Sequence, residues 1–271
     1  FDRATGFITR YEVGGNSLLG EGGSLKPNFW RAVTDNDMGA QSQKNFAAWR
    51  TPKMKLRSLT VDKKLKTVVA VYNMPAVKST LTLTYQVEAN GTLVVTQDLK
   101  TTPGAKVSEM LRFGMVMNLP YDMDQVQWNG RGPIENYSDR KISQNVGIYH
   151  ATADDLFYPY VRPQETGTMS DLRWWNQTNK NGVGFRVESD KLFSASALHY
   201  DLLTLDEGKE KKQRHSQSVE KSKYTNLFID LVQSGVGGVD SWGGDGRARK
   251  GHRVEYKDYT FSFRIAPKTL Y

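Results

Sequence analysis

The most constraining feature of the sequence is a pair of alternating segments separated by Asn90-Gly91. In residues 79–88 (STLTLTYQVE), every second residue from Leu81 to Val87 is apolar, and Thr80, Thr82 and Thr84 lie on the opposite face. A second extended segment, residues 92–100 (TLVVTQDLK), follows directly. Asn-Gly favours a tight turn because both residues tolerate positive φ. This pattern predicts a β-hairpin and favours a fold built from antiparallel strands.

The same period of two recurs along the chain, whereas helical patterns are rare. Further strands are expected at residues 67–72, 114–119, 126–128, 183–188, 192–198, 226–232 and 259–265. Two helical turns are expected over 43–50 and one over 151–157, where Thr152 is the N-cap and Asp155 completes a capping box. We therefore predict an all-β domain spanning residues 1–271, with two packed antiparallel sheets and one or two short helices.

Composition excludes several classes of protein. The 271 residues include no cysteine, so disulfides, thiolate catalysis and Cys-ligated zinc are ruled out. No run of 18 apolar residues predicts a membrane span. The first residues lack the pattern of a signal peptide and an initiator Met, so we expect a processed protein or a fragment of a longer one. The compartment stays open.

The formal charge of +8 raises the question of a polyanion partner. The densest basic cluster is interleaved with acidic residues and does not form a stripe along a helix, which favours a solvated loop over a nucleic-acid or lipid site. Its members are Lys209, Lys211, Lys212 and Arg214, with Glu207 and Glu210 between them.

Most motifs that suggest chemistry fail on spacing. Asp35-Asn36-Asp37 with Gly39 resembles a calcium loop, but Gly39 falls at position 5 and Phe46 at position 12 of an EF-hand pattern. The four histidines lack metal-ligand spacing, and no phosphate-binding or dinucleotide fingerprint is complete. Acidic pairs, which we expect at turns and caps rather than in acid–base roles, are Asp35/Asp37, Asp122/Asp124, Glu135/Asp139 and Asp154/Asp155.

Two loops mix aromatic, charged and glycine residues: 128–140 (WNGRGPIENYSDR) and 235–246 (GVGGVDSWGGDG). A tryptophan among glycines, Trp242, has little to pack against locally. An indole face complements the C–H face of a sugar ring, whose hydroxyls a neighbouring carboxylate or amide would bind. Trp242 is therefore either part of a recognition surface or a plug at the end of the sandwich.

These segments resemble the C-terminal domain of glycoside hydrolase family 2 β-galactosidases. The resemblance runs along nearly the whole chain, in the order FDRATG, PNFWRAVTDNDMG, WNGRGPIENYSDR, YVRPQETG, LFSASALHY and GVGGVDSW. It implies a β-supersandwich of the galactose-mutarotase-like kind, the last of five domains. It also implies that the two catalytic glutamates and the magnesium ligands lie on a TIM-barrel domain that this chain lacks, so no cofactor is expected here. Bacterial members occur in both cytoplasm and periplasm.

The resemblance also assigns residues to the sugar site. Trp242 matches an aromatic residue that stacks on the sugar in the leaving-group position, and residues 38–43 resemble a mobile loop beside the same pocket, with Gly39 as its hinge. Gln41 and Ser42 depart from the Ser-Glu pair of the family pattern. The substrate-binding candidates are Trp242, Asp240, Asp35, Asn36, Asp37 and Gly39. Structural roles are expected for Arg131, Glu135, Asn136, Asp139, Arg140, Glu165, Thr166 and His199.

The resemblance implies that the parent protein hydrolyses terminal β-D-galactosides with retention, that this chain borders the aglycone subsite, and that the parent forms a homo-oligomer. Two alternatives stay open at this point. One is a free-standing sugar-binding or aldose-mutarotase-like protein, in which His150 or His199 would be the general base. The other is a purely structural or oligomerisation domain.

Overall fold

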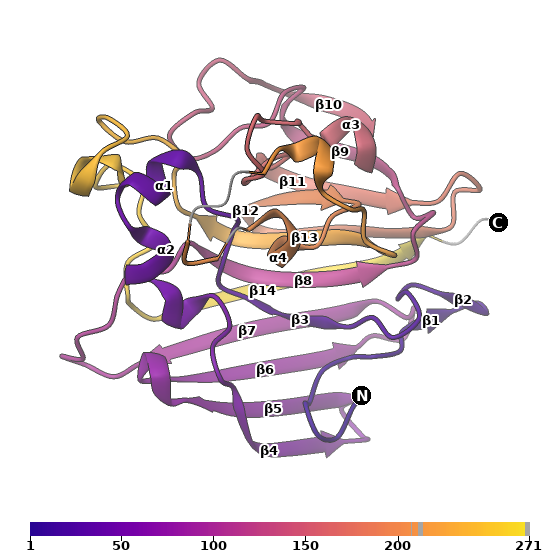
Figure 1. The fold of residues 1–271 in the computed structure, drawn as a ribbon. Helices are drawn as coiled ribbons and strands as arrows, with labels where there is room; N and C mark the ends of the chain where they lie inside the picture. Colours follow the sequence, from indigo (N-terminus) through magenta and orange to yellow (C-terminus); the bar gives the residue numbers. More distant parts are fainter. Residues whose placement is uncertain (207, 211–213, 269–271) are drawn as a thin grey trace.

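A computed structural model describes residues 1–206, 208–210 and 214–268, and nearly all of its regular structure is β-strand (Figure 1). The strands are β1 (Glu12–Val13), β2 (Asn16–Ser17), β3 (Leu25–Asn28), β4 (Lys55–Asp62), β5 (Thr67–Met74), β6 (Ser79–Val87), β7 (Leu93–Thr101), β8 (Arg112–Leu119), β9 (Gln125–Gly132), β10 (Asn145–Thr152), β11 (Met169–Thr178), β12 (Gly184–Leu198), β13 (Thr225–Gln233) and β14 (Tyr259–Lys268). All their pairings are antiparallel. The all-β prediction is confirmed.

Twelve of these strands form one continuous sheet that branches at β12. The main path runs β10-β9-β11-β12-β14-β7-β6-β5-β4, and the branch leaves β12 through β13 to β8 and β3. The first part of β12 pairs with β14, and its last part, Ser194 to Leu198, pairs with β13. The two predicted sheets are therefore joined through one long strand rather than being separate layers.

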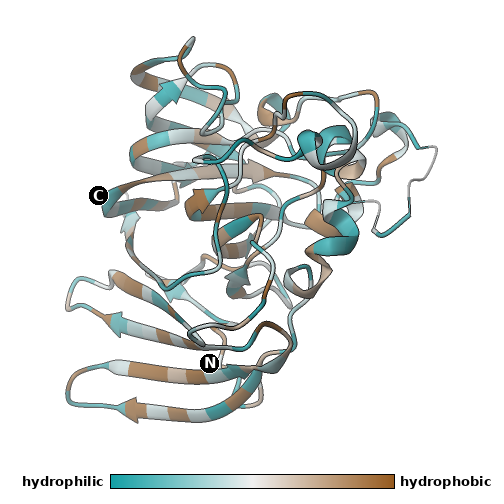
Figure 2. Ribbon diagram, turned by 90° about the vertical axis from the view of Figure 1, so that its left-hand side faces the viewer, coloured by the Kyte–Doolittle hydropathy of each residue, from teal (hydrophilic) through white to brown (hydrophobic). Residues whose placement is uncertain are grey.

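The branch packs on the main sheet through aromatic side chains. Phe113 on β8 stacks on Tyr259 of β14 with ring centroids 5.1 Å apart, and Phe29 packs against Phe113 at 6.0 Å. Every residue of β8 is buried, because other parts of the chain cover both of its faces. Along β6 and β7, apolar and polar residues alternate as the sequence pattern predicts (Figure 2).

The predicted hairpin is confirmed, with a different turn. Strands β6 and β7 pair from Ser79↔Thr101 to Val87↔Leu93. The connection is longer than a two-residue turn, and only Gly91 has positive φ, at 82°. The Asn90 side chain instead accepts a hydrogen bond from Thr92 N at 3.0 Å.

All seven other predicted strand segments lie in strands, but two of them are one strand. Residues 183–188 and 192–198 belong largely to β12, a single strand of 15 residues. The polar, exposed residues around Asp190 interrupted the alternation without interrupting the backbone. The sequence pattern also missed the two-residue strands β1 and β2, as well as β3, β4, β10 and β11.

Helices are more numerous than predicted, although each is about one turn long. The α-helices are α1 (Asp35–Gly39), α2 (Ser42–Asn45), α3 (Ala153–Leu156) and α4 (Leu202–Leu205), and the 3₁₀ turns are η1 (Ala47–Trp49), η2 (Pro75–Val77), η3 (Ser216–Ser218) and η4 (Gly243–Gly246). The capping box of Thr152 and Asp155 on α3 is confirmed. The two helical turns predicted over 43–50 are observed as α2 and η1, which are separated at Phe46 rather than forming one continuous helix, and η1 buries Trp49.

None of the helices in the described ranges has the length and apolar content that a membrane crossing requires. Of the basic cluster, Lys209 is exposed, and Arg214 donates to the Thr204 carbonyl at 2.5 Å. Glu207, Lys211 and Lys212 lie outside the described residues.

Candidate functional site

Helix α1 is fixed at its N-terminus by a capping box and a buried arginine. Thr34 Oγ1 accepts a hydrogen bond from Asp37 N at 3.2 Å, and Thr34 N donates to Asp37 Oδ2 at 2.9 Å. The Arg31 guanidinium donates to both carboxylate oxygens of Asp37, at 2.6 and 3.3 Å, and to the Gly235 carbonyl at 2.9 Å. Arg31 thus ties α1 to the start of the glycine-rich segment.

The Arg31–Asp37 pair is removed from water, with 0% and 5% of the two side chains exposed. Burial opposes the charged form of Arg31, but the carboxylates of Asp37 and Glu165 outweigh that effect, so the pKa of Arg31 is raised. A buried pair of this kind is strongly destabilising when one partner is lost, because the other charge then remains unpaired. The Arg31–Asp37 pair therefore holds α1 in place.

The glycine-rich segment, residues 235–251, forms a loop that we call the Trp242 loop. Gly235 N donates to the His252 carbonyl at 2.8 Å and closes the two ends of the loop. The Asp139 carboxylate accepts hydrogen bonds from Val236 N at 3.1 Å and Gly237 N at 2.9 Å. The base of the loop is therefore held by a carboxylate from the other motif-rich loop, as the predicted structural role of Asp139 requires.

The tip of the Trp242 loop lies against α1 (Figure 1). Asn36 Nδ2 donates to the Asp240 carbonyl at 2.9 Å. At Gly39, a Cβ would lie 1.8 Å from the Ser241 carbonyl oxygen, so only glycine allows this approach. Gly39 does not have a left-handed φ. Close backbone packing explains the glycine at this position, and its role as a hinge stays a prediction.

Trp242 projects from this tip into solvent, with 80% of its surface exposed. Its backbone N–H donates to Asp240 Oδ1 at 2.8 Å, which fixes the backbone just before η4. A cavity of about 260 Å³ lies beside the indole. Its lining consists of Asp35, Met38, Gly39, Gln41, Gln43, Lys44, Lys209, Glu210, Ser241 and Trp242.

The structure brings five of the six predicted site residues to this edge. Trp242, Gly39 and Asp35 line the cavity, and Asn36 and Asp240 position the loop beside it. Asp37 is the exception: it is 4% exposed, and its carboxylate binds Arg31 and Thr34. Asp37 thus supports the site from beneath and does not face a ligand.

Other residues at the site were not predicted. Lys44 Nζ lies 3.4 Å from Glu210 Oε1 across the mouth of the cavity. Arg162 Nε lies 3.2 Å from Asp35 Oδ1. The capping box of Thr34 and Asp37 was readable as Thr-x-x-Asp, whereas nothing in the local sequence marks an ion pair between distant segments.

The residues predicted to be structural do lie in networks between loops. Glu135 accepts a hydrogen bond from Gly167 N at 2.7 Å and pairs with Arg140 at 2.5 Å. Arg112 donates to Glu165 at 2.9 Å, and both are buried. Asn136 and Thr166 are also buried, and Arg131 pairs with Asp171 at 2.6 Å.

Neither histidine considered as a general base has the required surroundings. The His199 ring is 2% exposed, with Nδ1 3.0 Å from Asp154 Oδ1 and Nε2 3.1 Å from the Tyr121 carbonyl. His150 lies exposed on the edge strand β10. The geometry therefore gives no support to the mutarotase alternative, which needs a histidine and a glutamate facing one pocket.

Sequence comparisons agree with the motifs. The beta-galactosidase of Priestia megaterium is 30% identical over 246 residues, which cover 89% of this chain and 23% of that protein. The beta-galactosidase of Lactobacillus delbrueckii subsp. bulgaricus is 35% identical over 222 residues, covering 79% and 21%. The chain thus spans about a quarter of the length of these relatives and corresponds to one part of a larger polypeptide.

Among solved structures, an aldose epimerase homologue from C. elegans matches with a TM-score of 0.42 and 9% identity, covering 100% of this chain and 82% of that chain. A putative aldose 1-epimerase from Escherichia coli matches with a TM-score of 0.41 and 10% identity, covering 98% and 83%. Because these TM-scores are below 0.5, the family assignment depends on the sequence matches alone. The family model described as beta galactosidase small chain matches residues 1–265, and the chain therefore belongs to that family.

Proposed function

We propose that this chain is part of a β-galactosidase that hydrolyses terminal β-D-galactosides with retention, and that it forms one wall of the subsite for the leaving group. The family match and the names of its relatives support the activity. Their greater length leaves room for the TIM-barrel domain that would carry the catalytic glutamates. In this proposal the chain alone is inactive, and turnover of a nitrophenyl galactoside by the purified chain would refute that part.

The observation that carries the proposal is the exposure of Trp242 on a loop with fixed ends. An exposed indole loses water contact when a sugar ring stacks on it, and the Asp139, Asn36 and Gly39 contacts lower the cost of ordering the loop. Covering one indole face removes roughly 60 Å² of apolar surface, which at about 25 cal/mol/Å² stabilises the bound sugar by about 1.5 kcal/mol. This corresponds to roughly tenfold in affinity.

The test is Trp242→Ala in the complete enzyme, with Val239→Ala as a matched control. Val239 lies on the same loop and is 72% exposed, but it does not line the cavity. We expect Trp242→Ala to weaken glucose binding about tenfold and to lower the ratio of transfer to hydrolysis, while formation of the galactosyl-enzyme from aryl galactosides changes less. Unchanged glucose affinity in Trp242→Ala, or an equal loss in Val239→Ala, would reject the assignment.

The proposal also assigns a metal and partners to the parent enzyme. The expected magnesium is assigned to the catalytic domain, as the family resemblance implies, and no step here depends on it. Assembly into a homo-oligomer is supported by exposed apolar side chains on the edge strand β10, Val146 and Ile148, which an adjoining protein surface would bury.

A further inference from the structure

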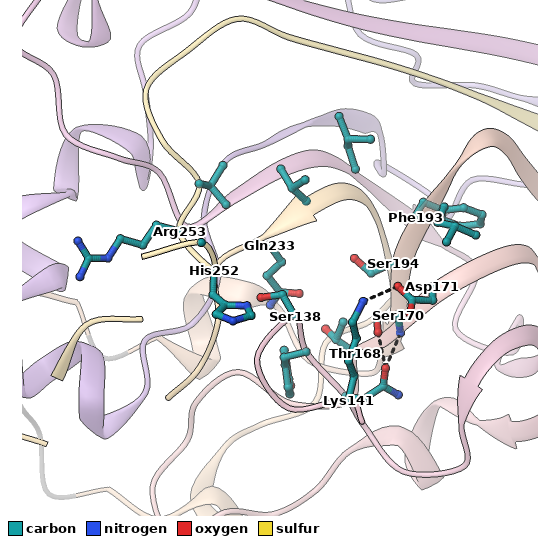
Figure 3. Close-up of a pocket in the computed structure, with 17 residues that line it drawn as sticks. Ser138, Lys141, Thr168, Ser170, Asp171, Phe193, Ser194, Gln233, His252 and Arg253 are labelled. Atoms are coloured by element: carbon teal, nitrogen blue, oxygen red, sulfur yellow. Dashed lines mark hydrogen bonds and ion pairs between the residues drawn. The ribbon is translucent and has the colours of Figure 1, made fainter. Parts of the chain in front are cut away.

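A second cavity of about 230 Å³ lies at the base of the Trp242 loop, away from the indole (Figure 3). Its walls come from the loop after β9, from β11, β12 and the end of β13, and from the segment that leaves the Trp242 loop. The lining residues on the last two are Leu231, Val232, Gln233, Gly251, His252, Arg253 and Val254. The cavity is smaller than the roughly 300–1,000 Å³ of drug-sized ligand pockets, which suits a ligand of one sugar ring or less.

One side chain in this cavity has unused hydrogen-bonding capacity. Gln233 is 9% exposed, and neither Nε2 nor Oε1 has a hydrogen-bond partner within the described part of the chain. Ser138 Oγ, which lines the same cavity, is also buried without a partner there. Figure 3 shows Gln233, Ser138 and His252 close together at one end of the cavity. Buried polar groups in native proteins are nearly always satisfied, so a molecule that enters this cavity would meet groups available to bind it.

The opposite end of the cavity is shaped by an irregular strand. β11 changes register against β12 on both sides of Leu172, and Asp171 has φ of 53°. This bulge directs Asp171 toward Lys141, and their side chains meet at 2.7 Å. Bulges of this kind commonly re-aim a side chain near a binding site.

The two basic side chains that line the cavity, Lys141 and Arg253, each have a hydrogen-bond partner. Lys141 is paired with Asp171, whose other carboxylate oxygen binds Arg131 at 2.6 Å. Arg253 Nε donates to the Ala248 carbonyl at 2.5 Å, and Arg253 points away from the cavity in Figure 3. The buried polar groups of this cavity that have no hydrogen-bond partner among the described residues are both uncharged: the Gln233 amide, which has a donor and an acceptor, and the Ser138 hydroxyl.

From this combination we propose that the cavity is a second binding site, for a neutral polyhydroxy compound of one sugar ring or smaller. Each hydroxyl of such a ligand both donates and accepts, which matches Gln233 and Ser138, and Phe193 and Val254 supply an apolar wall for its C–H groups. The site is separate from the Trp242 cavity, with which it shares no lining residue.

A ligand bound in this cavity would affect the Trp242 loop. The ligand contacts Gln233 just before the loop and His252 just after it, and these ends are joined by the hydrogen bond from Gly235 N to the His252 carbonyl. Bound ligand therefore slows amide exchange at both ends of the loop.

The test is hydrogen–deuterium exchange of the complete polypeptide that carries this chain, with and without galactose, glucose, glycerol or gluconate. We expect a neutral compound to protect peptides covering 136–141, 231–236 and 251–254, and the anion gluconate to protect them less. Gln233→Leu should weaken binding of the neutral compound, followed through this protection, about tenfold or more. The matched control is Gln97→Leu. Gln97 is buried, and among the described residues neither of its amide atoms has a partner, but it lies on β7 and does not line the cavity. The Gln97→Leu variant should therefore bind the neutral compound as the parent does.

Several results would overturn the proposal. Protection absent in the parent protein would mean that only water fills the cavity. Protection unchanged in Gln233→Leu would mean that the compound binds without the Gln233 amide, which contradicts the proposed site. Protection confined to 239–243 would assign the ligand to the Trp242 cavity instead, and stronger protection by gluconate would exclude a neutral ligand. If Gln233→Leu does not fold, Ser138→Ala removes one oxygen from the same wall and is judged by the same criteria.

Discussion

Replacing Gly39 by alanine tests how the Trp242 loop is positioned without touching the tryptophan. The new Cβ would lie 1.8 Å from the Ser241 carbonyl oxygen, whereas ordinary contact begins at 3.4 Å, so the two backbones must separate by about 1.6 Å. No side-chain rotation relieves this overlap, because the backbone fixes the positions of both the alanine Cβ and the Ser241 carbonyl oxygen. Overpacking of this kind costs about 1–3 kcal/mol of stability.

The displacement also removes Trp242 from its place beside the cavity. A gap of 0.5–1 Å already forfeits about a quarter to a half of a van der Waals contact, so a shift of about 1.6 Å abolishes most of the stacking. We therefore expect Gly39→Ala to weaken glucose binding by about as much as Trp242→Ala, roughly tenfold.

The measurements are glucose inhibition and the ratio of transfer to hydrolysis in the complete enzyme, together with the unfolding midpoint. Gly244→Ala is the control, since a Cβ at Gly244 meets nothing within 4 Å and its φ is not left-handed. A folded Gly39→Ala enzyme with the glucose affinity of the parent would refute the reasoning, as would an equal loss in Gly244→Ala.

Three further substitutions probe the supporting structure. Arg31→Met leaves Asp37 buried without its partner and should cost about 3–5 kcal/mol in urea unfolding, and a loss below 1 kcal/mol would contradict the assigned role. Thr34→Ala removes the N-cap of α1 and should cost about 1 kcal/mol in the same assay, whereas no loss would show that the cap is dispensable. Burial raises the pKa of Asp230 to about 8, although Arg112 opposes this, so the folded state binds the proton more tightly than the unfolded state. The stabilisation from this proton is complete below about pH 4 and declines toward pH 8. The free energy of unfolding of the parent, relative to that of Asp230→Asn, should therefore fall as the pH rises from 5 to 8. A difference that does not depend on pH would contradict the raised pKa of Asp230.

The strands that the sequence revealed are those whose side chains alternate between core and solvent. β6 and β7 show this alternation, and β14 shows it from Tyr259 to Ile265. β11 escaped prediction because its bulge breaks the period of two, with Asp171 in a left-handed conformation that the sequence does not announce. Helices α1 and α4 escaped because one turn is too short to display a period of 3.6, whereas α3 was found from its capping box.

The candidate site was predictable where a residue was unusual in its own surroundings. Trp242 stands out among glycines, and its exposure excludes the alternative of a plug at the end of the sandwich. Arg31 could not be found in this way, because its partner Gly235 is 204 residues distant in sequence and an arginine after a tryptophan is unremarkable. Asp37 lies beneath the site with its carboxylate on Arg31 and Thr34, and of these two contacts only the one to Thr34 was readable from the Thr-x-x-Asp pattern.

The two cavities lie at opposite ends of one element, and this arrangement has a consequence for both. The tip of the Trp242 loop is set by α1, and its base is set by Asp139 and the Gly235–His252 hydrogen bond. A ligand that stiffens the base reduces the entropy lost when a sugar stacks on the tip, which gives positive coupling without a change of shape. Coupling is reciprocal, so glucose at the tip should strengthen polyol binding at the base by the same factor. Gly39→Ala, which separates the tip from α1, should abolish that coupling while leaving the base cavity able to bind.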